Sequence, residues 1–165
     1  MRVNLKGLRL PLLLCLLAAS LIFFVSTYWY SVVVPKPVQE DDIREAVLRQ
    51  AFKDELANCG PEGEACCISI EGIGDPSVSL FARFRDQLKR GAECKVQEGT
   101  LLPVEIKTGR SALIIHMGKV RWYARTRAEV NVSTYCGMLC GGGGIFDIHR
   151  ESEGWVVEAR GRWVS

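Results

Sequence analysis

The chain has 165 residues, which is room for one ordinary domain and a short appendage, and 48% of them are hydrophobic. Its formal net charge is +2, but three of the 21 basic residues precede an apolar run near the amino terminus, and all 19 acidic residues follow it. The rest of the chain is therefore near neutral, at −1, which excludes an electrostatic argument for binding nucleic acid.

An uncharged run occupies residues 10–34, and its 25 positions are enough for a helix to cross a hydrocarbon core of about 30 Å. Basic residues precede this run and acidic residues follow it, so the positive-inside rule places the amino terminus in the cytoplasm. We therefore expect residues 1–34 to form a cytoplasmic tip and a single-pass transmembrane anchor in the cell inner membrane. The C-terminal domain is then expected to be periplasmic or otherwise extracytoplasmic.

A cleaved signal peptide is the alternative to this anchor. The run is longer than the usual apolar region of about 7 to 15 residues, and residues 26–31 contain no clear A-x-A-like cleavage site. Both observations favour a retained anchor. Cys15 lies inside the run and is interpreted as an ordinary membrane residue, with palmitoylation as the alternative.

The folded domain is expected at residues 42–165, after a stiff proline-containing linker at residues 35–41. Apolar residues recur at helical spacing over residues 43–57, and Asp42 and Glu45 have the spacing of a capping box. This segment is predicted to be the first helix of the domain.

A short apolar run at residues 65–70, ended by a glycine-rich turn, predicts a buried strand after that helix. Asp75 followed by Pro76 then predicts a helix start, because aspartate caps and proline fits the first helical position. Apolar residues at spacings of three and four continue this second helix to Leu88.

From residue 94 onward, apolar and polar residues alternate, which indicates strands. Strand candidates include residues 104–107 and 112–124, the latter interrupted at Gly118. Near the carboxyl end three rows each share one face of a strand: Val130, Val132 and Thr134; Phe146 and Ile148; Trp155, Val157, Ala159 and Trp163. The expected fold class is α+β, with the N-terminal transmembrane helix followed by two helices packed on a curved antiparallel sheet of four to five strands.

The cysteines carry the strongest chemical signal. Six of the seven lie in the part placed outside the cytoplasm, where an even number favours a disulfide framework: Cys59, Cys66, Cys67, Cys94, Cys136 and Cys140. Adjacent cysteines are poor partners, and the last two could close a tight loop. The favoured pairs are therefore Cys59 with Cys66, Cys67 with Cys94, and Cys136 with Cys140, among fifteen arrangements possible in principle.

Two other interpretations of the cysteines stay open, namely a metal site and free or redox-active thiols. A zinc site could use Cys136, Cys140 and His149, but the three-residue gap is not the usual C-x-x-C spacing, and no second pair of cysteines has metal spacing. No metal or other cofactor is therefore predicted.

The sequence contains little that indicates a reaction. There is no G-x-S-x-G or H-E-x-x-H motif, and the glycine run at residues 141–144 lacks the lysine of a phosphate loop, so we interpret it as a flexible connection between strands. His116 and His149 are the only histidines, and hydrogen-bonded surface positions are favoured over catalysis for both. No catalytic residue is predicted.

Several short segments together resemble a family of small, uncharacterised bacterial envelope proteins, over most of residues 65–165. They are Cys67-Ile-Ser-Ile, Asp75-Pro-Ser, Leu80-Phe-Ala-Arg-Phe, Cys94, the loop Val132-x-x-Tyr135-x-Gly137-x-Leu139-Cys140-Gly-x-Gly143, and Gly154-Trp-Val-Val. Cys59 and Cys66 lie outside this pattern. The order of helix then sheet is also similar to cystatin-like and nuclear-transport-factor-like folds, which host binding modules and enzymes alike.

Two classes of function are consistent with these features. The favoured one is a membrane-anchored, non-enzymatic binding or interaction module of the bacterial envelope. The alternative is a pocket enzyme that acts on a small molecule. The two differ in whether His116, Asp147 or His149 line a concave pocket or face water.

Overall fold

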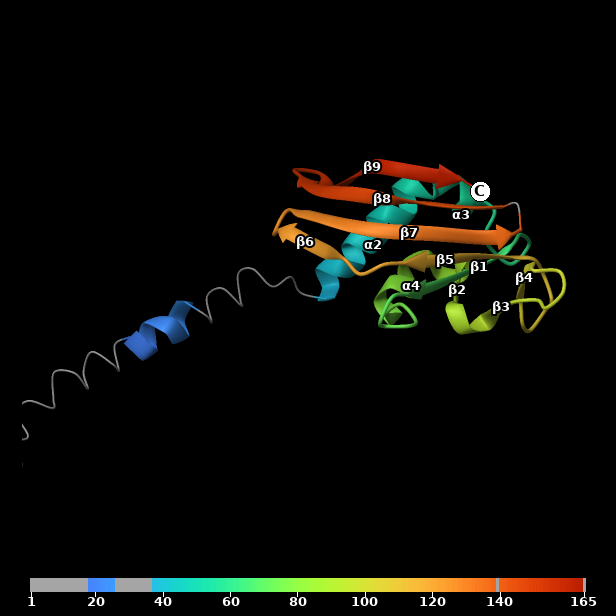
Figure 1. Ribbon diagram of the computed structural model, residues 1–165, viewed down its shortest axis with the longest axis horizontal. Helices are drawn as coiled ribbons and strands as arrows, with labels where there is room; N and C mark the ends of the chain where they lie inside the picture. The colour runs from blue at the N-terminus through green and yellow to red at the C-terminus, as the bar shows by residue number, and fades with distance from the viewer. Residues whose placement is uncertain (1–17, 26–36, 139, 165) are drawn as a thin grey trace, which may run out of the picture. The chain divides into compact units, whose positions relative to one another are not determined.

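The computed structural model describes residues 18–25, 37–138 and 140–164, and the chain divides into two units at residues 1–35 and 36–165. The strands found among the described residues all lie in the second unit. Its elements are described below by themselves, with the labels of Figure 1.

The transmembrane helix expected at residues 10–34 is not found. Within the described residues, no helix is long and apolar enough to cross a membrane. The described part of the expected span is the helical stretch of residues 18–25. Residues 10–17 and 26–34, and with them Cys15, lie outside the described residues.

The first helix of the domain begins earlier than the sequence predicts and is broken once. Helix α2 spans Pro37–Ala51, so most of the expected linker is its first turn, where a proline is well tolerated. Helix α3, Lys53–Ala57, follows directly after a break at Phe52, whose φ of −124° is not helical. Buried side chains of Ile43, Val47 and Leu48 lie on one stripe of α2 and face the sheet.

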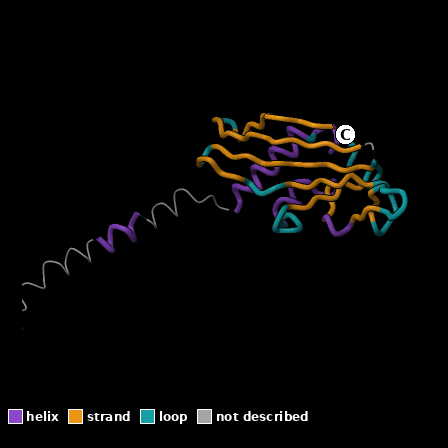
Figure 2. Tube along the Cα trace, viewed as in Figure 1, coloured by secondary structure: helices purple, strands orange, loops and turns teal. Residues whose placement is uncertain are grey.

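The described strands form a seven-stranded sheet in the order β2-β1-β5-β7-β8-β9, with β6 also paired to β7, and a separate two-stranded sheet of β3 and β4. Their bounds are β1 Ala65–Ile70, β2 Leu88–Arg90, β3 Cys94–Val96, β4 Pro103–Glu105, β5 Ala112–Met117, β6 Arg121–Ala124, β7 Arg127–Gly137, β8 Cys140–Glu151 and β9 Gly154–Val164. Figures 1 and 2 show the helices α2 and α3 behind the long strands.

The expected antiparallel sheet of four to five strands is therefore wrong in both number and direction. Strand β1 runs parallel to β2 and to β5, while the pairs from β5 to β9 are antiparallel. A parallel pair needs a crossover rather than a hairpin, and the segment that contains α4, Val78–Phe84, supplies it between β1 and β2. This mixed arrangement places β1 inside the sheet.

Helix α4 is shorter than the apolar spacing predicts. It begins at the N-cap Ser77, whose hydroxyl accepts a hydrogen bond from the Leu80 amide at 3.0 Å. It ends at Phe84, because Arg85 has a left-handed φ of 49°. The chain then forms a 3₁₀ turn, η1, Arg85–Gln87. Leu88, which was expected to be the last apolar residue of this helix, is instead the first residue of β2.

The core lies between the helices and one face of the seven-stranded sheet. Phe146 and Ile148 face this core, as their alternation predicts, and Phe146 packs edge to face on Phe52 with ring centroids 5.7 Å apart. Val130 and Val132 on β7 are fully buried beside them. The antiparallel part of the sheet therefore follows the expected pattern of one buried face.

Strand β9 departs from the expected alternation. Trp155 and Trp163 were expected on one face, because eight residues separate them. However, β9 has an irregularity where Phe146 pairs with Ala159 and Ile145 pairs with Gly161, which leaves Arg160 unpaired in the ladder. One extra residue moves every later side chain to the other face. Trp163, opposite Gly143, is consequently half exposed and outside the core.

Candidate functional site

The four glycines at residues 141–144 lie inside β8 and are not the flexible connection that the sequence suggests. They pair with β7 on one side, and Gly142 to Gly144 also pair with β9 on the other. A Cβ atom on Gly144 would lie 2.5 Å from the Gly161 carbonyl oxygen, and one on Gly143 would lie 2.7 Å from the Trp163 ring. Glycine is required here because neighbouring strands and side chains approach the backbone closely.

The bare backbone of this strand forms one wall of a pocket of about 320 Å³. This glycine pocket lies on the helix side of the sheet and is otherwise lined mainly by apolar groups. Its lining residues are Phe52, Glu55, Leu113, Thr134, Cys136, Cys140, Gly141, Gly142, Gly143, Arg162, Trp163 and Val164. Its volume is at the lower end of the range typical of small-molecule sites.

Two opposite charges lie at the glycine pocket. Arg162 Nη2 is 3.9 Å from Glu55 Oε1, and the same nitrogen donates weakly to the Ala51 carbonyl at 3.5 Å. Both side chains are more than a third exposed, so the pair is only loosely held. The polar group deeper in the pocket is Thr134, whose hydroxyl donates to the Gly142 carbonyl at 3.3 Å. An apolar wall with few polar groups suits an amphipathic small molecule.

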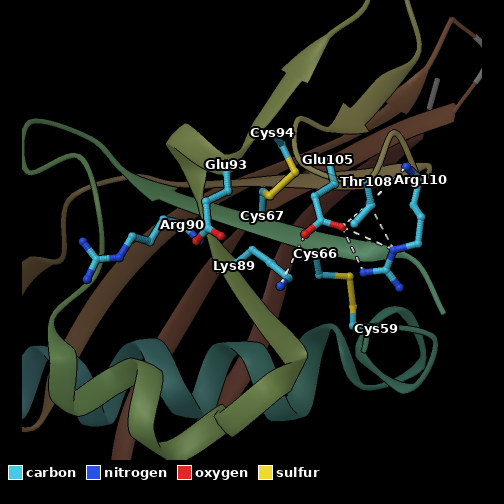
Figure 3. Close-up of a disulfide and its surroundings, with 10 residues drawn as sticks. All are labelled: Cys59, Cys66, Cys67, Lys89, Arg90, Glu93, Cys94, Glu105, Thr108 and Arg110. Carbon is cyan, nitrogen blue, oxygen red and sulfur yellow. Dashed lines mark hydrogen bonds and ion pairs between the residues drawn. A yellow bond between two sulfur atoms is a disulfide. The ribbon is translucent and has the colours of Figure 1, made fainter. Parts of the chain in front are cut away.

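All six described cysteines are paired, so the disulfide framework expected from their even number is present. The bonds join Cys59 to Cys66, Cys67 to Cys94, and Cys136 to Cys140. Figure 3 shows the first two, which start from adjacent residues of β1 and point away from each other. Successive side chains of a strand face opposite sides, so β1 is bonded to the end of α3 on one side and to β3 on the other.

A buried carboxylate, Glu105 on β4, lies near these two disulfides (Figure 3). Its Oε2 accepts hydrogen bonds from the Thr108 hydroxyl and from Arg110 Nη2, the latter at 3.0 Å, and its Oε1 is 3.4 Å from Lys89 Nζ. The Thr108 hydroxyl and the Arg110 guanidinium lower the pKa of Glu105 to about 2, with a smaller contribution from Lys89. Glu105 is therefore ionised at neutral pH and acts as a structural anchor.

Arg110 also binds the loop that the Cys59–Cys66 disulfide closes. Its Nη1 donates to the carbonyl oxygens of Gly60 and Gly63, both at 3.3 Å, and to that of Pro61. One guanidinium thus connects the Glu105 carboxylate with the turn that follows α3. Neither residue lies in a recognisable local motif, so neither role could be predicted from the sequence.

Asp147 and His149, two of the residues that distinguish the two classes of function, line a pocket of about 430 Å³ on the other face of the sheet. Asp147 is 3.7 Å from Arg160 Nη1, and His149 Nε2 is 3.2 Å from Glu151 Oε1. Neither histidine nitrogen is joined to a nucleophile by these contacts. These contacts place Asp147 and His149 in a charged surface that lines this pocket.

The centre of that surface is Glu129, which is buried. It accepts a hydrogen bond from the Tyr123 hydroxyl at 3.0 Å, bonds to Arg160, and lies 3.4 Å from Arg121. Burial raises the pKa of Glu129, but the hydrogen bonds from Tyr123 and Arg160 outweigh it, so this pKa is lower than its ordinary value. Glu129 is consequently ionised and unsuited to donate a proton at neutral pH.

His116 faces water on β5, where its Nδ1 lies 3.0 Å from the Ser69 hydroxyl oxygen on β1. The two residues are register partners on adjacent parallel strands. A nucleophilic serine needs a third group to orient the histidine, and no contact recorded for His116 among the described residues involves a carboxylate. We interpret the pair as a hydrogen bond on the sheet surface.

No group of three histidine, cysteine, aspartate or glutamate side chains that could hold a metal ion is found among the residues that the structure describes. Comparisons of the chain with models of protein families, with curated proteins and with solved structures found no match. The resemblance to small bacterial envelope proteins therefore stays a prediction, and the glycine pocket is judged on its own geometry.

Proposed function

We propose that this chain is a non-enzymatic binding domain of an oxidising compartment outside the cytoplasm, and that it binds a small, largely apolar molecule in the glycine pocket. The observation that carries this proposal is the pocket of about 320 Å³, in which the backbone of Gly141 to Gly143 forms one wall beside mainly apolar groups. Glycine in a strand often marks a place where a ligand approaches the backbone.

The state of the buried carboxylates supports binding over catalysis. Catalytic acids need a pKa near the working pH, which enzymes commonly achieve by raising it. In this domain Glu105 and Glu129 are held by cations and hydroxyl groups, and the pKa of each is lower than its ordinary value. Groups stabilised in this way support the framework of the domain rather than transfer protons.

The ligand class follows from the lining of the pocket. Phe52, Leu113 and Val164 present apolar surface, while Arg162 is partly exposed and only loosely paired. A molecule with an apolar body and a single anionic group would fit both features, because the cation can bind the anion once Glu55 is displaced. Binding is expected to depend on salt, since both charges are exposed.

A pocket-filling substitution tests this proposal. Thr134→Met places a longer side chain in the pocket, whereas Ser133→Met, at the neighbouring position of β7, lies on the opposite face of the sheet. Fluorescence titration with 1-anilinonaphthalene-8-sulfonate, an apolar anion, should show saturable binding to the parent and to the Ser133→Met protein. Thr134→Met should abolish it. Equal binding by all three folded proteins, or none by the parent, would count against the pocket.

A further inference from the structure

One of the three disulfides differs from the others in accessibility. Cys59, Cys66, Cys67 and Cys94 are each at most 9% exposed, so the first two bonds are covered by the domain. Cys140 is exposed and Cys136 is half-buried against the core. A thiolate in solution can therefore reach the third bond more readily than the other two, and Cys140 is the more exposed of its two residues.

The sheet does not need this bond to keep its strands paired. Cys136 and Cys140 flank the turn between β7 and β8, whose ladder already joins Gly137 to Cys140 and continues from Tyr135 and Gly141. The hairpin therefore keeps its backbone pairing if the sulfur–sulfur bond opens. The other two bonds join segments that no hairpin connects, at separations of 7 and 27 residues.

Exposed apolar side chains lie close to the turn that this bond closes. Met138, in the turn itself, is 69% exposed, and Leu101 and Leu102 from the β3–β4 loop are 46% and 49% exposed. Leu102 lies against the turn, because a Cβ atom on Gly137 would be 3.0 Å from its Cδ2. The Tyr135 hydroxyl donates to the Leu101 carbonyl at 2.6 Å and fixes this loop beside the hairpin.

We propose that the Cys136–Cys140 disulfide is a site of thiol–disulfide exchange with a dithiol protein, which docks on the apolar surface formed by Leu101, Leu102 and Met138. Small charged thiols gain nothing from that surface, whereas a protein with an apolar rim around its reactive cysteine does. The inference does not depend on the pocket being occupied, so it stands apart from the proposed function.

The exchange is a two-electron reaction in two steps. A partner thiolate attacks Cys140 Sγ, a mixed disulfide forms, and Cys136 Sγ leaves as a thiolate that takes a proton from water. The second partner thiolate then attacks the partner's own sulfur in the mixed disulfide, and Cys140 leaves as a thiolate that is also protonated. The partner is oxidised to a disulfide, and the chain gains two thiols. The reverse sequence restores the bond.

The first test measures selectivity on the full-length chain. The protein is treated with dithiothreitol, quenched with iodoacetamide at intervals, and mapped by mass spectrometry. Cys136 and Cys140 should be alkylated roughly ten-fold faster than the four buried cysteines, because exposure limits the attack. Similar rates at all six positions, or faster opening of either buried pair, would overturn the proposal.

The second test separates docking from accessibility. A thioredoxin-like dithiol protein without its second cysteine serves as the probe, and it should be trapped as a mixed disulfide on Cys140. Leu102→Glu should slow this trapping several-fold and leave the dithiothreitol rate unchanged, since only the protein uses the apolar surface. Trapping on another cysteine, or the same trapping rate for Leu102→Glu as for the parent, would contradict the proposed docking surface. Ile106→Glu, at an apolar residue that is 55% exposed and lies outside that surface, is the charge-matched control.

Discussion

The side-chain amide of Gln50 on α2 hydrogen-bonds to the outer edge of the sheet at Trp155. Its Nε2 donates to the Trp155 carbonyl at 2.8 Å, and its Oε1 accepts from the next outward-facing amide, that of Val157, at 3.1 Å. Strand β9 is the last strand of the sheet, so these backbone groups have no neighbouring strand. The Gln50 side chain thus makes the two hydrogen bonds that a neighbouring strand would otherwise make. These backbone groups are then not available to pair with the edge strand of another chain.

Gln50→Leu should therefore destabilise the domain by about 1 to 3 kcal/mol, because two hydrogen bonds to β9 are lost. The amide of Val157 should exchange with deuterium faster than in the parent, which hydrogen-exchange mass spectrometry can measure. Lys53→Leu, an exposed change on the adjacent helix α3, is the control. Unchanged exchange in β9 would show that the helix does not protect this edge.

The lowered pKa of Glu105 predicts a specific dependence of stability on pH. The pKa of this carboxyl is about 2 in the folded domain against 4.5 for an ordinary glutamate. Its contribution, up to about 3 kcal/mol, should be fully present above pH 4.5 and should be lost as the pH falls toward 2. Urea unfolding over this range measures the loss.

Glu105→Gln identifies the source of that dependence. The variant should be less stable at pH 7 by about 2 to 3 kcal/mol, since Arg110 and Lys89 lose their counter-charge, and its stability should vary less between pH 4.5 and pH 2. Glu98→Gln, at an exposed position in the same hairpin, should behave as the parent. An unaltered pH profile in Glu105→Gln would assign the acid sensitivity to other groups.

The disulfides should differ in their effect on stability. Loop-closure entropy gives about 2 kcal/mol for the separation of 4 between Cys136 and Cys140, and about 3.5 kcal/mol for the separation of 27 between Cys67 and Cys94. Replacement of the first pair by serine should leave the circular dichroism spectrum and most of the stability intact. Replacement of the second pair should cost more, because it also leaves hydroxyl groups in a buried site. The reverse order in chemical denaturation would refute this ranking.

Replacing either of two aromatic residues by alanine should destabilise the domain, and the more buried residue should have the larger effect. Phe146 is 1% exposed and packs on Phe52, so Phe146→Ala should cost about 3 to 5 kcal/mol. Trp155 is only half-buried, against Trp122 with ring centroids 5.8 Å apart, and Trp155→Ala should cost about 1 to 3 kcal/mol. Thermal unfolding of the two variants beside the parent decides the order.

The compartment can be tested independently of the fold. Alkaline phosphatase fused to the carboxyl terminus should be active if the domain lies in the compartment proposed above, because disulfides such as the three among the described residues form and persist in an oxidising environment. A cytoplasmic reporter at the same position should be inactive. The opposite pair of results would overturn the proposed location.

The sequence predicts the buried face of β7 and of the second half of β8, because the alternation at Val130 and Val132 and at Phe146 and Ile148 is a local signal that one buried face imposes. It does not predict the parallel pair of β1 and β2. The spacing of Val78 and Leu88 is compatible with a single helix, and only the left-handed Arg85 and the contact of Leu88 with β1 decide against it. A short apolar segment has no periodicity that distinguishes these outcomes.

The glycine pocket and the Glu105–Arg110 pair are predicted less well, because both depend on segments that only the folded chain brings together. A run of glycines indicates missing side chains but not what occupies their place. Here the neighbours are strands β7 and β9 and the ring of Trp163, and the position of that ring depends on the bulge at Arg160. Likewise, Glu105 and Arg110 are ordinary charged residues until the chain reversal between β4 and β5 brings them together.

Every disulfide of the domain joins a cysteine to the next one along the chain. Cys59 bonds to Cys66, Cys67 to Cys94, and Cys136 to Cys140, so no bond encloses or interleaves with another. As the polypeptide is made from its amino end, an oxidant that joins cysteines strictly in order of their appearance produces the native set at once. Such a chain needs an enzyme to form its bonds but none to reshuffle them, and it is protected from the non-native cross-links that delay maturation of proteins with nested disulfides.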